Sequence, residues 1–89
     1  MSTQKLPTIR EYIAHTNDLV TSNTLTIEQA IILQTCYRNT LEGKLTNINF
    51  LMQVTALSWK QINYILNGLI MKGALTSPEK KWYIVKIAQ

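Results

Sequence analysis

Amide, phenol and ammonium side chains recur at helical spacing in residues 58–73 of this 89-residue chain. Stepping about 100° per residue places Lys60, Tyr64 and Asn67 on one side of a helix, with Asn63 at the edge of that side. An asparagine or glutamine can pair with an adenine edge through two hydrogen bonds, and lysine or tyrosine can contact a phosphate. This segment contains no acid. The pattern therefore indicates a surface for a polar or anionic partner.

The charge distribution agrees with that interpretation. The net charge is +4, yet residues 1–42 contain three bases and four acids, whereas residues 43–89 contain six lysines and only Glu79 as an acid. Such asymmetry is typical of a C-terminal half that faces a polyanion. A solvated basic surface without a partner remains the alternative.

Catalytic patterns are missing from the sequence. It has no paired carboxylates in one segment, no glycine-rich phosphate loop, no metal-ligand cluster and no recognisable nucleophile motif. We expect a protein that is not an enzyme and that uses no cofactor or metal. His15 is expected at the surface, and Cys36, the single cysteine, is expected to be a buried and unreactive thiol.

No membrane partner is expected either. The N-terminus lacks the apolar region of a signal peptide, and no apolar run approaches the ~20 residues that span a bilayer. A single cysteine also fits a reducing compartment. We therefore expect a cytoplasmic protein.

The polar face must be positioned by a helix over residues 58–72. Ser58 and Gln61 are spaced as a capping box, and Gly73 is suited to end the helix. The inward stripe at i, i+3, i+4, i+7 and i+8 consists of Ile62, Ile65, Leu66, Leu69 and Ile70.

Three further helices are predicted over residues 8–22, 26–42 and 46–54, with Pro7 at the start of the first. The second begins with a Thr26–Gln29 capping box, ends at Gly43 and carries a possible Arg38–Glu42 ion pair. Its apolar residues spread over a broad arc, so it should be the central pillar of the core; they are Ile27, Ala30, Ile31, Leu33, Tyr37 and Leu41.

The third helix is expected to start at Thr46 as N-cap and to bury Ile48, Leu51 and Met52. Residues 55–57 then turn the chain into the next helix, so that Leu57 fills the corner of a helix-turn-helix. A β-hairpin follows over residues 74–87, with Lys80 and Lys81 at its tip.

This order of elements resembles the winged helix-turn-helix family. Residues 46–75 are similar to its helix-turn-helix core, VTALS (54–58) resembles the turn, and LIMKGAL (69–75) resembles the exit into the wing. The resemblance covers about residues 26–87. It implies a single winged helix domain over residues 1–89, mostly α with a β-hairpin, with an extra N-terminal helix as in MarR-like and small phage or plasmid regulators.

The resemblance also implies a function and its residues. Helix 58–72 would be the recognition helix of a transcriptional regulator that binds double-stranded DNA, and residues 77–81 would be the tip of the wing. The DNA-binding residues expected on this basis are Ser58, Lys60, Gln61, Asn63, Tyr64, Asn67, Lys80 and Lys81. Departures from the MarR type are a wing without arginine and a chain that ends near Ile87.

Two further expectations concern proteins as partners. A winged helix can instead be an interaction module, with Trp59, Tyr64, Met71 and Trp82 as anchors, although the position of Trp59 near the apolar stripe favours the core. The stripe of Ile9, Tyr12 and Ile13 on the N-terminal helix predicts a homodimer, on the reasoning that so small a core has little need of this helix.

Overall fold

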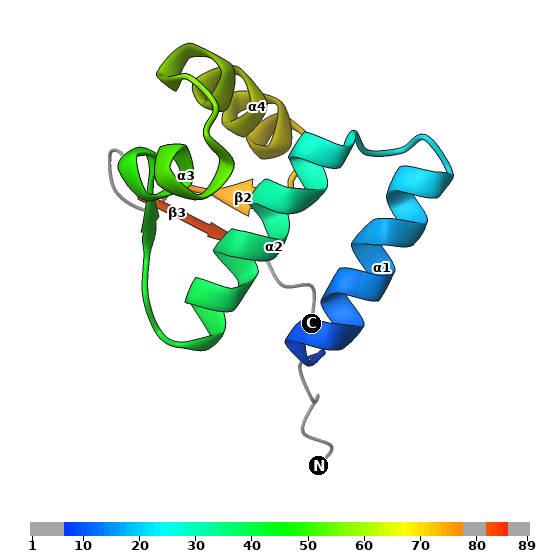
Figure 1. Ribbon diagram of the computed structural model, residues 1–89. Coiled ribbons are helices and arrows are strands. Elements are labelled where there is room, and N and C mark those ends of the chain that lie inside the picture. The colour runs from blue at the N-terminus through cyan, green and yellow to red at the C-terminus, as the bar shows by residue number, and fades with distance from the viewer. Residues whose placement is uncertain (1–6, 78–81, 86–89) are drawn as a thin grey trace.

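The computed structural model describes residues 7–77 and 82–85 (Figure 1). Within these residues the protein is mostly helical, with four helices and three short strands, as the mostly α prediction requires. In chain order the elements are α1 (Ile9–Thr21), α2 (Ile27–Leu41), β1 (Thr46–Asn47), α3 (Ile48–Thr55), α4 (Trp59–Met71), β2 (Leu75–Thr76) and β3 (Trp82–Val85). None of these four helices has the length and apolar content needed to cross a lipid bilayer.

The predicted ends of α4 are confirmed. Ser58 is the N-cap, and its hydroxyl accepts a hydrogen bond from the Gln61 N–H at 3.2 Å, while the Gln61 carbonyl accepts one from the Ser58 N–H at 3.0 Å. These two bonds satisfy N–H groups that the first turn leaves without helical partners. Gly73 follows the helix with φ +79°, a left-handed conformation that glycine adopts without strain.

The start of α1 differs from the prediction. Pro7 is predicted at the start of the helix, but Thr8 is the N-cap and the first helical residue is Ile9. Thr8 forms a capping box with Glu11 in which both reciprocal hydrogen bonds are present. Pro7 lies one residue before the cap. Its carbonyl accepts a hydrogen bond from the hydroxyl of Tyr37 on α2, so this end of α1 is tied to the core.

Helix α2 is the central pillar, as predicted. Figure 1 shows α1 on one side of α2, and α3, α4 and the strands on the other, and α2 contacts α1, α3, α4, β1 and β3. The core comprises Leu25, Ile32, Leu33, Cys36, Tyr37, Ile48, Leu51, Ile62, Leu66, Leu69 and Leu75.

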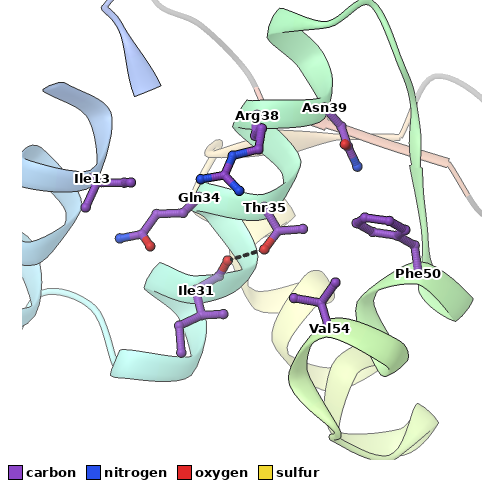
Figure 2. A pocket seen from close by; sticks show the side chains of 8 residues that line it. All are labelled: Ile13, Ile31, Gln34, Thr35, Arg38, Asn39, Phe50 and Val54. Atoms are coloured by element: carbon purple, nitrogen blue, oxygen red, sulfur yellow. Dashed lines mark hydrogen bonds between the residues drawn. The ribbon is translucent and has the colours of Figure 1, made fainter. Parts of the chain in front are cut away.

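The predicted inward arc of α2 is partly wrong. Ile32 is fully buried, whereas Ile27, Ile31 and Leu41 are 66%, 40% and 41% exposed. The buried positions are those that point at the neighbouring helices. Ile31 instead faces the open space between α1 and α3 (Figure 2), a direction that the helical period alone could not distinguish from an inward one.

Helix α1 packs against the core of the protein. Tyr12 stacks on Tyr37 of α2 with ring centroids 3.9 Å apart. Thr16 is buried, and its hydroxyl accepts a hydrogen bond from the Gln34 amide at 2.7 Å. The reasoning that the core has little need of the α1 stripe is therefore wrong. The homodimer remains a prediction, without that support.

A strand that the sequence did not predict joins the hairpin. Thr46 and Asn47 form β1, which pairs with β3, and β2 pairs with β3 from the other side, giving the antiparallel order β1-β3-β2. Thr46 is consequently a buried strand residue and not a helix cap; Asn47 caps α3 by accepting from the Phe50 N–H. A bond from the Asn39 amide to the Thr46 hydroxyl, at 2.9 Å, ties the strand to α2.

The turn between α3 and α4 is short. Ala56 ends α3 in the left-handed region, with φ 60°, and the chain reaches the α4 N-cap two residues later. Leu57 is half-buried and packs against the core, as predicted for a residue that fills the corner. Helices α3 and α4 therefore form a tight helix-turn-helix whose second helix has one buried face.

The buried stripe of α4 yields a stability prediction. Leu66 has no exposed surface, and replacing it by alanine leaves a cavity at the centre of the core. Leu66→Ala should lower the free energy of unfolding by about 2–5 kcal/mol. Met71→Ala, at an 88% exposed position of the same helix, should change it by no more than about 0.5 kcal/mol. Urea unfolding of both variants tests the assignment, and equal effects would contradict it.

Cys36 provides a second prediction. It is fully buried, and desolvation raises the pKa of its thiol to about 12. The native protein should therefore resist thiol reagents at pH 8 and react rapidly once unfolded in urea. An unfolded cysteine ionises near pH 8.5, so the free energy of unfolding should also fall as the pH rises from about 8.5 towards 12. Fast labelling of the folded protein would show that the thiol is accessible.

Candidate nucleic-acid interface

The outer face of α4 is a row of exposed side chains. Lys60, Tyr64, Asn67 and Met71 succeed one another at intervals of three or four residues, and all four are exposed. Their opposite neighbours Ile62, Leu66 and Leu69 are buried. The structure therefore brings three of the predicted site residues, Lys60, Tyr64 and Asn67, onto one surface.

Ser58 and Gln61 lie at the start of this face but are engaged in the cap. The Gln61 carbonyl already accepts a hydrogen bond from the Ser58 N–H at 3.0 Å, which holds the side chain against the first turn. A bidentate contact with adenine needs both the carbonyl and the amine of the amide. Gln61 could make such a contact only by breaking its hydrogen bond in the cap. With the cap intact, only the NH₂ group of its side chain is available, as a hydrogen-bond donor.

The two asparagines are not equivalent. Asn67 is exposed, whereas Asn63 is half-buried at the edge of the face, as the helical spacing predicted. A base edge can reach an exposed amide without displacing neighbouring side chains. Asn67 is therefore the better placed of the two for reading a base.

Lys80 and Lys81, the predicted wing contacts, lie outside the residues that the structure describes. What the structure does place is the hairpin that leads to them. Leu75 pairs with Val85 and Thr76 with Ile84, and the central strand β3 contacts α2.

Two residues near the α4 face were missed by sequence reasoning. Lys72 directly follows α4, and its ammonium donates to the backbone carbonyl of Thr24 in the α1–α2 connection at 3.1 Å. Glu28, in the first turn of α2, lines a hollow together with Tyr64, Asn67 and Met71. The sequence contained no signal for Glu28, since 36 positions separate it from Tyr64.

Exposed apolar groups accompany the polar ones. Tyr64 and Met71 are 82% and 88% exposed, as expected of possible interface anchors. Trp59 is 55% exposed, so the sequence-based preference for a core tryptophan is wrong. As the first residue of α4, it lies where the helix has only begun to pack on its neighbours.

A second hollow opens between α1, α2 and α3 (Figure 2). Its lining combines the apolar side chains of Ile13, Ile31, Phe50 and Val54 with Arg38 and three uncharged polar residues. The lining contains no acid, histidine or cysteine. Its one hydroxyl, that of Thr35, donates a hydrogen bond to the Ile31 carbonyl at 2.8 Å.

The predicted Arg38–Glu42 ion pair is wrong. Glu42 instead pairs with Lys44 at 3.2 Å. Figure 2 shows the Arg38 side chain extending back along α2 toward Gln34, away from the end of the helix where Glu42 lies. Long helical side chains point toward the N-terminus of their helix, which separates Arg38 from a residue one turn further on.

Within residues 7–77 and 82–85, no group of three or more histidine, cysteine or acidic side chains is arranged to hold a metal ion. Comparison of the chain with protein-family models, with curated proteins and with solved structures finds no match. Inferences about function therefore rest on the fold and on the α4 face.

Proposed function

We propose that this protein is a winged helix-turn-helix domain that binds double-stranded DNA in a sequence-specific manner and regulates transcription. The observation that carries the proposal is the exposed, acid-free face of α4, the second helix of a tight helix-turn-helix. Such a helix can lie in the major groove with its N-terminal part toward the base edges.

The chain topology supports the same proposal. From α2 onward the order is helix, strand, helix, helix, strand, strand, with the sheet order β1-β3-β2. A winged helix would have this order, with the strand before the helix-turn-helix paired to the returning strand of its wing. Helix α1 is then the additional N-terminal helix.

The roles of the residues follow from their chemistry. Asn67 is proposed to read a base, namely adenine through its N6 and N7 atoms. Asn63 is the second candidate, reaching the same groove from the edge of the face. Lys60, Tyr64 and the Ser58 and Gln61 side chains are proposed to contact phosphates, as are Lys80 and Lys81 of the wing.

A second candidate function is docking of a protein partner through the same face. It is favoured by the exposure of Trp59, Tyr64 and Met71, since aromatic residues and methionine are enriched at protein interfaces. The lysine at each end of α4 and the lack of acid within the helix favour DNA.

The first test is a titration with random duplex DNA at several salt concentrations. Each lost phosphate contact reduces the slope of log K against log[salt] by about 0.9. Lys60→Ala should therefore weaken binding to all sequences alike and reduce the slope by about that amount. Fluorescence anisotropy with a labelled duplex measures both quantities.

Lys44→Ala is the matched control. It removes the same charge from an exposed lysine in the connection between α2 and β1, which Figure 1 places at the opposite end of α2 from α4. It should leave the slope nearly unchanged. Equal slopes for the two variants would mean that net charge, and not the α4 face, determines binding, and no binding by the wild type at low salt would favour the protein-docking candidate.

Base reading generates a separate prediction. After a preferred site has been selected from a random library, Asn67→Ala should weaken binding to that site by ~1–3 kcal/mol while affinity for random duplex is retained. The specificity ratio should fall accordingly. Asn17→Ala, at an exposed position of α1, provides the control for loss of an amide.

Asn63→Ala, measured in parallel, identifies which amide reads the base. Its thermal melt must be recorded as well, because the half-buried position can affect folding. If both asparagine variants discriminate the selected site as the wild type does, α4 does not read bases through these amides.

A further inference from the structure

Gly68 lies in the interior of α4, where glycine is an unfavourable residue. Without a side chain, its backbone loses more conformational freedom on folding than that of any other residue. At the two other glycines of the described chain, the backbone conformation explains the residue type. Gly43 and Gly73 follow helices and have φ of +74° and +79°, a region that favours glycine. Gly68 has ordinary right-handed helical geometry, so its conformation does not require glycine.

Packing within the chain does not require glycine there either. A Cβ atom built at Gly68 meets no heavy atom within 4 Å. Alanine would therefore fit without displacing a neighbour, and it should stabilise the helix. Glycine at this position therefore weakens α4 without a contact inside the described chain that explains it.

The surroundings of Gly68 suggest an external reason. Gly68 lines the hollow between α4 and the start of α2, together with Tyr64, Asn67, Met71 and Glu28. Tyr64, Asn67 and Met71 are exposed side chains of the proposed DNA-binding face. A patch of uncovered helix backbone thus lies among the side chains that would contact DNA. Glycine is the residue that permits close approach of a ligand to the backbone.

We infer that Gly68 is kept free of a side chain so that an uncharged part of the DNA, a deoxyribose or a base edge, can approach the α4 backbone. This inference rests on the proposed DNA-binding function. The Glu28 carboxylate in the same hollow would repel a phosphate, and the rest of its lining is uncharged. The phosphates are left to groups outside the hollow, such as Lys60, which lies roughly 12 Å from Gly68 along the axis of α4.

The experiment compares Gly68→Ala and Gly68→Gln with the wild type, using the full chain, thermal melts and the same duplex titration. Gly68→Ala should raise the melting temperature by about 2–8 °C and weaken DNA binding by about tenfold, with the salt slope unchanged because no phosphate contact is lost. Gly68→Gln should weaken binding further, since its side chain is longer. Ala14→Gln, at an exposed position of α1, should bind as the wild type does.

The outcomes separate this inference from the proposed function. If the wild type binds DNA, Lys60→Ala reduces the salt slope and both Gly68 variants bind normally, the DNA-binding proposal stands and the inference fails. A lower melting temperature for Gly68→Ala would overturn it too, because that would reveal a packing role within the chain. A reduced salt slope for Gly68→Ala would mean that a phosphate, and not an uncharged group, lies at Gly68. If the wild type binds no DNA, both proposals fall.

Discussion

The burial of α2 on two sides is the interaction on which the rest of the structure depends. Tyr37 has its ring stacked on Tyr12 of α1, and its hydroxyl donates to the chain just before α1. Other residues of the same helix, among them Ile32 and Leu33, belong to the cluster that includes Leu66 of α4. A chain of this length has one small core. Because α2 is buried on two sides, elements on both sides of it can pack against that core. Weakening α2 would therefore disturb α1 and the helix-turn-helix together.

The functional proposal follows from how α4 is held against this core. Its apolar stripe is buried, its first turn is closed by the Ser58–Gln61 box, and the tight turn at Ala56 fixes its direction relative to α3. A recognition element must be rigid, because a polar side chain discriminates between bases only if its position is fixed. Here the rigid part is the helix, and the side chains that project from it are an ammonium, a phenol and an amide.

The α4 face is nevertheless mixed in character. Met71 and Tyr64 add apolar surface, and Glu28 brings an acid from α2 to the edge of an otherwise acid-free helix. In a DNA complex a carboxylate is tolerated beside base amino groups or sugars but not beside phosphates, so Glu28 would limit how a duplex could lie against α4. A protein partner would instead bury the side chains of Met71 and Tyr64 in the interface. The dependence of binding on salt separates the two cases, because only DNA binding releases condensed counterions in proportion to the number of phosphate contacts.

Local features of the chain were determined by the sequence alone. The caps at Thr26 and Ser58, the glycines that end α2 and α4, the buried stripe of α4 and its polar face all arise from contacts between residues a few positions apart. Helical period and capping chemistry are sufficient to predict such features. The burial of Cys36 could be predicted for a similar reason, since it lies inside a predicted helix and a free cysteine in that setting is usually buried.

Tertiary structure decided what depends on contacts between distant segments. A strand of two residues, Thr46 and Asn47, is too short to be predicted from a sequence pattern. These residues form a strand because β3 lies beside them. Whether Ile31 or Ile32 is buried depended on where α1 and α3 lie around α2, and whether Trp59 is covered depended on how the first turn of α4 meets its neighbours. The position of Glu28 beside α4 likewise results from chain folding. The helical period and the composition describe one segment at a time. The burial of a residue at the edge of an apolar stripe depends on which other element of the chain covers it.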